Sequence, residues 1–418
     1  MKIEINEEFK EALDLIAQTN ICVFVTGRAG TGKTTFLRYY MTQVSKKTVV
    51  LAPTGVAALN AGGETIHSFF KFSPAVTVSK IKNKNLGGGS IYKKVETIII
   101  DEASMLRCDL LDCMDKFLRL NRQKHREPFG GVQIVFIGDL CQLPPVVRQE
   151  ERDVFSTVYE SPFFLHARVL SNCMMRTVEL KKIYRQSDPE FIYILNSVRN
   201  KTIDDASIRK LNRQVAKSLP EQDMRIYLTT TNKRAASINE QYLSKIKEKA
   251  FEFNAVTEKV SPTEKENAFP AEQTLIVKKG AQVMMLNNDA AGRWVNGSIG
   301  IVTDIIKDKK GEKSSICVRF PSGRIEKAEP FVWELFKYKW NDKDQQIETE
   351  SAGFFRQYPL KLSWAVTIHK SQGKTFDNVV IDMERGAFAP GQLYVALSRC
   401  STLEGISLMR PLSRRDIL

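Results

Sequence analysis

The stretch GRAGTGKT occupies residues 27–34 of this 418-residue chain and decides how the first part of the sequence folds. It fits the pattern G-x-x-x-x-G-K-[ST]; an apolar run at residues 21–25 precedes it, and a helical pattern begins near Thr35. Glycines let the backbone wrap around phosphate oxygens, and the N–H groups at a helix N-terminus attract negative charge. Since strand, loop and helix agree, we predict a triphosphate-binding loop rather than a chance glycine-rich turn.

The loop assigns residues to a nucleotide and a metal ion. Lys33 is expected to reach the β and γ phosphates, and the Thr34 hydroxyl is expected to ligate Mg²⁺. The expected cofactors are therefore ATP and Mg²⁺. The nucleotide-binding residues predicted from this stretch are Gly30, Thr31, Gly32, Lys33, Thr34 and Thr35.

Two acidic residues follow the apolar run at residues 97–100. Asp101 is expected to hold the magnesium ion through water, and Glu102 to orient and deprotonate the attacking water. An Asp-Glu pair alone is a weak signal that also fits a solvated strand end, but its position after the phosphate loop strengthens the prediction. Gln142 follows the next apolar run, at residues 132–137, and could touch the γ-phosphate; a proline-terminated surface loop is the alternative.

Strand-like and helical patterns alternate along both ends of the chain. Apolar β-branched runs at residues 48–51, 97–100 and 132–137 are separated by helical patterns such as residues 109–120, which predicts a parallel sheet covered on both faces. A lysine- and glycine-rich stretch at residues 82–94 predicts an exposed loop. A second α/β unit begins after about Arg185 and resumes at Leu360. Between its two parts, short β-like runs separated by glycine turns predict a small β-barrel insertion.

The composition of the chain limits the classes of ligand, cellular location and metal site that can be expected. Lys plus Arg number 62 against 48 Asp plus Glu, a net charge of +14 that points toward polyanions but is weak evidence alone. No apolar run approaches the ~18 residues that span a bilayer, and no apolar segment follows the N-terminal glutamates, so we expect no membrane association and a cytoplasmic, nucleoid-associated protein. The seven cysteines form no CxxC pair and are expected to be reduced core residues. The four histidines lack zinc-ligand spacing.

An ordered set of motifs resembles the superfamily 1B DNA helicases. Those of the first half are GRAGTGKT (27–34), APTGVAA (52–58), TIHSF (65–69), DEAS (101–104) and GDLCQLPP (138–145). The segment PFGGVQ (128–133) is similar to the signature of the Pif family, and the match continues through YRQ (184–186), LTTTN (228–232), TIHKSQG (367–373) and YVALSR (394–399). The resemblance covers essentially the whole chain, which looks like a minimal bacterial-type helicase core.

The resemblance implies a fold and its domain limits. It implies two RecA-like parallel-sheet domains of the P-loop type, the first at residues 1–62 and 81–183 and the second at residues 184–255 and 358–418. It also implies a small wedge insertion at residues 63–80 and an inserted Src-homology-3-like β-barrel at residues 256–357. Phe69, Phe70 and Phe72 could form an apolar wedge or an ordinary hydrophobic patch. We expect Trp294, Trp333 and Trp340 to be core residues rather than base-stacking platforms.

Further nucleotide contacts are implied by the same resemblance. With one phosphate loop and two α/β units, the nucleotide is expected to lie in a cleft to which Arg185 and Arg399 bring cations for the γ-phosphate. Gly373 joins the nucleotide-binding set. The sequence departs from the family at Phe9, where a glutamine that reads adenine is expected. Gln18 is one candidate substitute, and Tyr184 is a candidate for stacking on the base.

A translocase must hold any sequence, so its grip needs contacts to phosphate and sugar from hydroxyls, amides and helix N-termini. For His67 and His369 the alternative is a buried core histidine. The predicted DNA-binding residues are Pro53, Thr54, His67, Ser68, Thr231, Asn232, His369, Lys370 and Ser371.

The activity implied by the resemblance is ATP-dependent 5′-to-3′ unwinding by a monomer that tracks on single-stranded DNA. Forked or tailed duplexes, G-quadruplexes and RNA–DNA hybrids are the implied substrates, in replication, repair, recombination or genome maintenance. Two alternatives remain: an RNA-directed or duplex-translocating ATPase with little unwinding, and a protein that uses ATP to switch its affinity for unusual DNA structures without motor activity. Glu102 argues against the pure switch, which has no need for a carboxylate poised on water.

Overall fold

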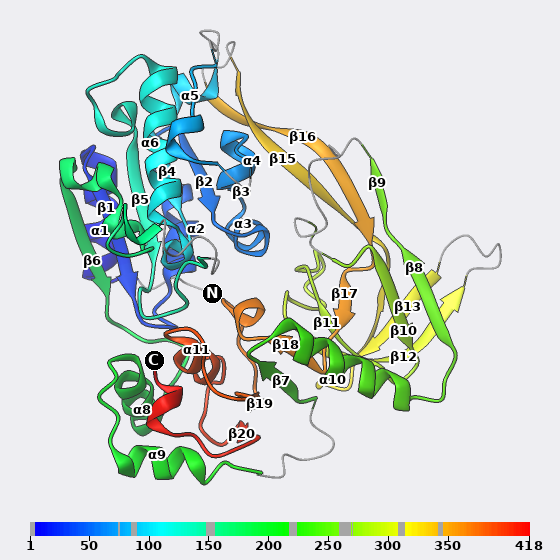
Figure 1. Cartoon of the computed structure of the whole chain (residues 1–418). Helices are drawn as coiled ribbons and strands as arrows, with labels where there is room; N and C mark the ends of the chain where they lie inside the picture. The colour runs from blue at the N-terminus through cyan, green and yellow to red at the C-terminus, as the bar shows by residue number, and fades with distance from the viewer. Residues whose placement is uncertain are drawn as a thin grey trace. The chain divides into compact units, whose positions relative to one another are not determined.

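The computed structural model describes residues 5–73, 76–84, 90–147, 155–216, 224–258, 269, 271–307, 314–341 and 346–418. The chain divides into two compact units (Figure 1). The first unit comprises Met1–Arg185 and Phe336–Ala352, and the second comprises Gln186–Leu335 and Gly353–Leu418. Within the described ranges, no helix is both long enough and apolar enough to cross a membrane. All seven cysteines are free, and five of them are buried, in line with the prediction of reduced core residues.

The first unit contains the predicted parallel sheet, with strand order β3-β2-β4-β5-β1-β6 and every neighbouring pair parallel. Its strands are β1 (Cys22–Gly27), β2 (Thr48–Ala52), β3 (Glu64–Thr65), β4 (Thr97–Ile100), β5 (Gln133–Gly138) and β6 (Met175–Leu180). Its α-helices are α1 (Glu7–Gln18), α2 (Lys33–Gln43), α3 (Gly55–Ala61), α4 (Ile66–Phe70), α5 (Ile91–Lys94) and α6 (Cys108–Arg122). Its 3₁₀ turns are η1 (Val78–Lys80), η2 (Ala103–Met105), η3 (Pro128–Gly131), η4 (Phe164–His166) and η5 (Arg168–Asn172).

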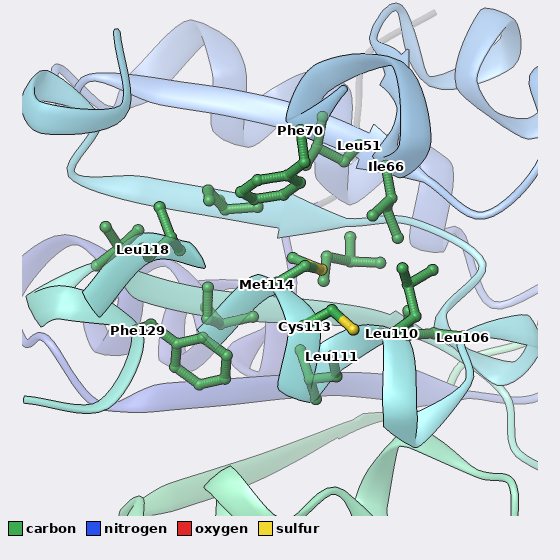
Figure 2. Packing of buried hydrophobic residues seen from close by; sticks show 14 of the residues in the cluster. Leu51, Ile66, Phe70, Leu106, Leu110, Leu111, Cys113, Met114, Leu118 and Phe129 are labelled. Atoms are coloured by element: carbon green, nitrogen blue, oxygen red, sulfur yellow. The ribbon is translucent and has the colours of Figure 1, made fainter. Parts of the chain in front are cut away.

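Both faces of this sheet are covered by helices, because successive residues of each strand point into different clusters. In β4, Ile98 and Ile100 belong to the cluster formed with α6, whereas Ile99 belongs to the cluster formed with α1 and α2. The same alternation occurs in β5, where Ile134 and Val135 lie in different clusters. Strands buried on both faces read as continuous apolar runs, which is the pattern seen in the sequence. Figure 2 shows the side of the core under α6.

The phenylalanines of the predicted wedge belong to this core. Phe69 is 4% exposed and Phe70 is 0% exposed, and the Phe70 ring packs edge-on against Phe117 of α6 with centroids 5.4 Å apart. Phe72 is partly buried against the same cluster. The alternative of an ordinary hydrophobic patch is therefore correct for these rings, and an apolar wedge built from Phe69 and Phe70 is wrong, because a ring that fills the core cannot meet a duplex.

The exposed loop predicted at residues 82–94 is only partly correct. Residues 85–89 lie outside the described ranges, but the last part of the stretch forms the short helix α5. Ile91 and Tyr92 on this helix are 7% and 6% exposed. Tyr92 also donates a hydrogen bond of 2.6 Å to the Phe69 carbonyl, so α5 ties the end of the loop to the core.

The second unit contains a smaller parallel sheet with strand order β18-β7-β19-β20. These strands are β7 (Ile226–Thr229), β18 (Ala365–Thr367), β19 (Val379–Asp382) and β20 (Ile406–Leu408). The helical elements of the unit are α8 (Pro189–Arg199), α9 (Asp205–Asn212), α10 (Asn232–Lys245), η7 (His369–Ser371), α11 (Gln392–Leu397) and η8 (Arg414–Asp416). The predicted second α/β unit, which begins near Arg185 and resumes near Leu360, is therefore present.

Antiparallel strands fill the chain between the two parts of this α/β unit. One sheet has the order β14-β13-β12-β11-β17, formed by Ile325–Ala328, Ser314–Arg319, Ile299–Lys307, Gln282–Met285 and Leu360–Leu362. Two smaller sheets pair β10 (Thr274–Lys278) with β8 (Ala250–Asn254) and place β15 (Phe331–Asn341), β16 (Gln346–Gln357) and β9 (Val256–Glu258) in that order. Closure of these strands into a Src-homology-3-like barrel stays a prediction.

Two of the tryptophans are buried as expected. Trp294 is 5% exposed and its indole N–H donates to Asn287 Oδ1 at 3.0 Å, while Trp333 is 7% exposed. The side chain of Trp340 lies outside the described part of the structure.

Replacing Phe70 with alanine tests its place in the core. We expect Phe70→Ala to lower the free energy of unfolding by about 3–5 kcal/mol, since it leaves a cavity among packed rings. Met174→Ala is the control, because its side chain is 70% exposed, and a change within about 0.5 kcal/mol is expected there. Denaturant unfolding measures both. Equal, small effects for the two variants would contradict the core assignment.

Candidate nucleotide and nucleic-acid site

The predicted phosphate loop joins β1 to α2, as its sequence pattern indicated. β1 ends at Gly27 and α2 begins at Lys33. Gly30 and Gly32 have φ values of 83° and 84°, a left-handed conformation that glycine adopts without steric cost. A Cβ atom at Gly27 would lie 2.6 Å from Thr31 Oγ1 and 2.7 Å from the Leu180 carbonyl oxygen, so a side chain has no room there. The glycines are therefore required by the loop's own geometry.

Lys33 lies at the centre of the site. Its ammonium group donates to the carbonyl oxygens of Gly27 at 2.6 Å and Arg28 at 2.9 Å. Burial lowers the pKa of Lys33, and the Asp139, Glu102 and Asp101 carboxylates oppose that shift, in decreasing order of strength. The charge on this lysine is therefore balanced by acids from two neighbouring strand ends and by its own loop.

Asp101 and Glu102 lie directly after β4. Burial, followed by the neighbouring charge of Glu102, raises the pKa of Asp101 to about 7. Glu102 has a left-handed backbone with φ 51°, and its N–H donates to Asp101 Oδ1 at 3.0 Å. A cation bound here would offset both the burial of the Asp101 carboxylate and the repulsion from the Glu102 charge.

The donor set suits Mg²⁺. The structure shows no group of three or more His, Cys, Asp or Glu residues suited to a metal ion among the residues it describes. Mg²⁺ does not need one, because it typically takes one or two carboxylates together with substrate phosphates and water. Thr34 in the first turn of α2 and Asp101 at the end of β4 offer the hard oxygen ligands that this ion prefers.

The segment after β5 is packed tightly against the Asp-Glu turn. A Cβ at Gly138 would lie 3.1 Å from the Ala103 backbone nitrogen, so the strand end approaches η2 closely. Asp139 is fully buried and accepts a hydrogen bond from the Cys141 N–H at 3.1 Å. Gln142 is 5% exposed. Asp139 was missed as a site residue in the sequence, although it stands beside Gly138 in the same motif.

Tyr184 and Phe9 lie against the phosphate loop. The Tyr184 N–H donates to the Gly30 carbonyl at 2.9 Å, and its ring carbons lie 3.8 Å from where a Gly32 Cβ would be. Phe9 contacts the same position at 3.8 Å and is 2% exposed. Phe9 therefore serves as a core residue beneath the loop, and Tyr184, at 46% exposed, keeps a ring available for stacking.

Gln18 is not brought to the loop. It ends α1, nine residues after Phe9, which is about 14 Å along the helix axis. Its amide donates to Asp14 Oδ1 at 3.4 Å on an exposed face. The direction in which α1 docks therefore gives no support to Gln18 as the residue that reads adenine.

The two predicted arginines have different surroundings. Arg185 lies in the first unit, and its charge lowers the pKa of Lys33. Arg399 lies in the second unit, just after α11, and is 1% exposed. Its guanidinium donates to the carbonyls of Val395, Ser371 and Lys374 at 3.0, 3.4 and 3.3 Å and to Ser398 Oγ at 2.8 Å. Gly373, with φ 75°, lies between two of these acceptor residues.

The predicted DNA contacts of the first unit meet at one sheet edge. Pro53 and Thr54 follow β2, and Thr54 Oγ1 accepts from a backbone N–H of α3 at 3.3 Å. His67 and Ser68 lie in α4, immediately after β3, and Ser68 Oγ donates to Glu64 at 3.0 Å. Because β2 and β3 are adjacent and parallel, the four residues gather at the carboxyl ends of both strands.

The predicted DNA contacts of the second unit follow adjacent strands in the same manner. Thr231 caps α10 by accepting from the Arg234 N–H at 3.2 Å, and Asn232 begins the helix. His369 and Lys370 lie in η7, which begins two residues after the last residue of β18. These strands, β7 and β18, are parallel neighbours.

Ser371 differs from its expected role. Its side chain is 0% exposed, and its hydroxyl donates to the Ile368 carbonyl at 2.7 Å. Its own carbonyl accepts from Arg399. A hydroxyl used in this way is not offered to a nucleic acid, so Ser371 orders the turn beside Arg399 instead of contacting DNA through its side chain.

The surroundings of the two motif histidines favour their neutral forms. Burial lowers the pKa of His67, more strongly than Asp109 raises it, and burial alone lowers the pKa of His369. Neither side chain is fully buried, and the His369 ring stacks on Phe388 with centroids 6.2 Å apart. They therefore offer hydrogen bonds and ring surfaces rather than positive charge.

The raised pKa of Asp101 predicts how stability depends on pH. Between the ordinary pKa of 3.8 and the folded value of about 7, the folded protein holds a proton that the unfolded chain releases, so this contribution to stability is lost as pH rises. We expect Asp101→Asn, in the absence of nucleotide and metal, to gain stability relative to the unsubstituted protein as pH rises from about 4 to about 8. Thermal unfolding measures the difference. The exposed Asp14→Asn is the control, and the same pH trend in both variants would refute the site-specific cause.

Comparisons with known proteins cover the whole chain. The family model described as PIF1-like helicase matches residues 4–209, and the one described as UvrD-like helicase C-terminal domain matches residues 362–403. The ATP-dependent DNA helicase Pif1 of Bdellovibrio bacteriovorus is 34% identical over 420 residues, covering 98% of this chain and 88% of that protein. The ATP-dependent DNA helicase PIF1 of Xenopus laevis is 34% identical over 399 residues, covering 93% of this chain but 58% of that protein.

Solved structures agree. The crystal structure of Bacteroides sp Pif1 in complex with ADP-AlF4 has a TM-score of 0.88 and 38% identity, covering 100% of this chain and 95% of that one. Bacteroides Pif1 bound to single-stranded DNA has a TM-score of 0.72 and 39% identity, with the same coverage. With these matches running through both units and through the phosphate loop, the chain belongs to the PIF1-like family of ATP-dependent DNA helicases.

Proposed function

We propose that this chain is a motor that hydrolyses ATP to move 5′ to 3′ along single-stranded DNA and to separate duplex strands ahead of it. One observation carries the proposal: the backbone N–H of Asp101 donates to the Leu51 carbonyl at 2.9 Å. Leu51 lies in β2, and Pro53 and Thr54 follow it. The acids proposed to act in hydrolysis and the predicted DNA-binding residues of the first unit are therefore neighbours on one sheet edge. A structural change at the triphosphate would be transmitted to the bound DNA through this edge.

Each residue of the nucleotide site has a role in this proposal. Lys33 neutralises the β and γ phosphates, Glu102 orients the attacking water, and Gln142 contacts the γ-phosphate. Thr34 and Asp101 would hold Mg²⁺, which would neutralise charge at the phosphate oxygens. Arg185 and Arg399 bring positive charge to the γ-phosphoryl group. The Tyr184 ring stacks on the base, and the loop residues Gly30, Thr31, Gly32 and Thr35, together with Gly373, complete the nucleotide contacts.

The DNA contacts in the proposal come from the two sheet edges already described. Pro53, Thr54, His67 and Ser68 hold the strand on one unit, and Thr231, Asn232, His369 and Lys370 hold it on the other. Hydroxyls, amides and neutral imidazoles bind backbone without reading bases, which suits a protein that must accept any sequence. The similar Bacteroides protein is known bound to single-stranded DNA, which supports this class of ligand.

The substrate range and setting are part of the proposal. Forked and tailed duplexes are proposed as substrates, supported by the structural study of unwinding at forked double-stranded DNA by two coordinating Pif1 helicases. G-quadruplexes and RNA–DNA hybrids, and a place in replication, repair or recombination of a bacterial nucleoid, are proposed by family resemblance. We propose that one copy suffices for tracking. The alternative of an ATP-switched binding protein is disfavoured by Glu102 beside the phosphate loop.

Removing the loop lysine tests the catalytic assignment. We expect Lys33→Ala to lower DNA-stimulated ATP hydrolysis at least about a hundredfold, because a preorganised cation at the phosphates is lost. Binding of single-stranded DNA without nucleotide should change little. Glu102→Gln should bind ATP yet fail to hydrolyse it, and the exposed Lys10→Ala is the control. Phosphate release measures turnover; a Lys33→Ala variant that still hydrolyses ATP in response to DNA would refute the site.

Tail preference tests direction and motor action together. Duplexes with a 5′ single-stranded tail should be unwound, whereas those with a 3′ tail should stay intact, because the protein loads on the tail and moves toward its 3′ end. Gel separation of a labelled strand measures the product. Equal unwinding of both would contradict the polarity, and ATP-dependent binding with no unwinding of either would favour the affinity switch.

A further inference from the structure

A glutamate occupies the predicted DNA-contact site of the second unit. Glu384 comes two residues after β19 (Val379–Asp382), on a backbone with φ 44°. A side chain other than glycine is disfavoured in this left-handed conformation and persists only where the surroundings hold it. The residue is therefore placed by its neighbours and not by its own backbone preference.

The Glu384 carboxylate accepts hydrogen bonds from the hydroxyls of two threonines. Thr230 Oγ1 donates to Glu384 Oε2 at 2.6 Å, and Thr231 Oγ1 lies 3.2 and 3.3 Å from the two carboxylate oxygens. A hydroxyl has one proton to give. While these hydroxyls donate to Glu384, neither threonine can donate to a phosphate oxygen. Thr231 Oγ1 also accepts a hydrogen bond from the Arg234 N–H in the first turn of α10.

The cavity around the Glu384 carboxylate could also hold another anion, such as a phosphate group. This cavity has a volume of about 650 Å³ and is formed by Thr230, Thr231, Lys233, Arg234, Asp382, Glu384, Arg385, Gly386 and Phe388. Three of the nine lining residues are cationic, and the N-terminus of the 14-residue helix α10 lies at this cavity. Arg234 is partly neutralised by Asp382 at 2.8 Å, so Lys233 and Arg385 supply the remaining positive charge.

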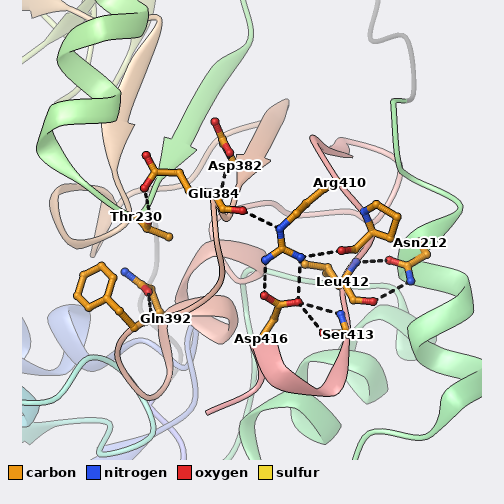
Figure 3. A network of polar contacts seen from close by, with 11 residues as sticks. Asn212, Thr230, Asp382, Glu384, Gln392, Arg410, Leu412, Ser413 and Asp416 are labelled. Atoms are coloured by element: carbon orange, nitrogen blue, oxygen red, sulfur yellow. Dashed lines mark hydrogen bonds and ion pairs between the residues drawn. The ribbon is translucent and has the colours of Figure 1, made fainter.

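A second set of contacts holds the backbone of Glu384 through hydrogen bonds to its N–H and its carbonyl. Its N–H donates to Asp382 Oδ1 at 3.0 Å, and its carbonyl accepts from Arg410 Nε at 2.9 Å. Arg410 is held in turn by an ion pair with Asp416 (Figure 3). The network reaches the last turn of the chain and leaves the Glu384 side chain directed at Thr230. A carboxylate that merely filled space would not need such support.

We propose that Glu384 is a built-in competitor for a DNA phosphate. In the protein without DNA, the carboxylate accepts hydrogen bonds from the hydroxyls of Thr230 and Thr231. When single-stranded DNA binds, a backbone phosphate accepts these hydrogen bonds at the N-terminus of α10 in its place, and the Glu384 side chain is displaced. The inference rests on the proposed function, in which Thr231 and Asn232 contact DNA. Its effect is to weaken the grip of the second unit, so that the strand is released more readily in each cycle.

A purely structural role predicts the opposite result. If Glu384 only ordered the two threonine hydroxyls for a ligand, its removal would leave them unaligned and DNA binding would weaken. If it competes with phosphate, its removal frees two hydroxyl donors and removes one negative charge, and binding tightens. The sign of the change in affinity therefore decides between the two roles.

The test compares two substitutions with a matched control. Glu384→Gln removes the charge and keeps the shape, and Glu384→Gly also suits the left-handed backbone. Glu240→Gln makes the same charge change at an exposed position further along α10. Binding of a fluorescent oligothymidine is measured by anisotropy without nucleotide. We expect both Glu384 variants to bind about three- to tenfold more tightly at low salt, a gain that shrinks as added salt screens the charge.

Valine substitutions of the threonines locate the gain. In a chain carrying Thr230→Val and Thr231→Val, Glu384→Gly should improve binding less than it does in the unsubstituted chain, because the hydroxyl donors that this substitution frees are absent. An undiminished gain would mean a general charge effect and would overturn the displacement model.

The remaining outcomes separate this inference from the proposed function. If the unsubstituted protein binds single-stranded DNA and is stimulated by it, yet the Glu384 variants bind no more tightly than Glu240→Gln, the competitor role is wrong and the motor stands. If the unsubstituted protein does not bind single-stranded DNA, both fail. Thermal unfolding accompanies each variant, and loss of the fold in both Glu384 variants would show a structural role and also overturn the proposal.

Discussion

The site of the first unit depends on keeping one buried lysine charged. Burial lowers the pKa of Lys33, which disfavours its ammonium form, and the carboxylates of Asp139, Glu102 and Asp101 oppose that shift. These acids reach it because β4 and β5 lie beside each other, with β1 next to β5, in a parallel sheet whose strands all end at the same edge. The strand order is therefore what turns separate motifs into one phosphate-binding centre.

The same edge carries the residues through which we propose that ATP hydrolysis is linked to DNA binding. Parallel neighbours place the residues after β2 and β3 beside those after β4, and the hydrogen bond from Asp101 to Leu51 fixes their spacing. The second unit repeats the arrangement without a phosphate loop: Thr231 follows β7 and His369 follows β18. Its acid, Glu384, acts on the threonines instead of on a nucleotide. Similar sheet edges thus carry different sets of side chains at their strand ends.

Some features could be predicted because they depend on neighbours in sequence. The strand, glycine loop and helix around Lys33 are a local pattern, and the alternation of apolar runs with helical stretches fixes a parallel sheet. Other features depend on docking. Gln18 is a candidate for reading adenine from the sequence, but α1 packs with Phe9, at its other end, against Gly32. Phe70 looks like a wedge residue in sequence and becomes core because α6 covers it.

The sequence by itself determined the parallel α/β architecture, the phosphate loop and the family, since each follows from short-range patterns and their order. Only the tertiary structure decided which side chains form hydrogen bonds or ion pairs with one another. Glu384 meets Thr230 across 154 residues, and Ser371 loses its hydroxyl to its own turn while its carbonyl receives Arg399. Hydrogen bonds act over about 3 Å, so they report the final packing of strands and turns, which no local pattern contains.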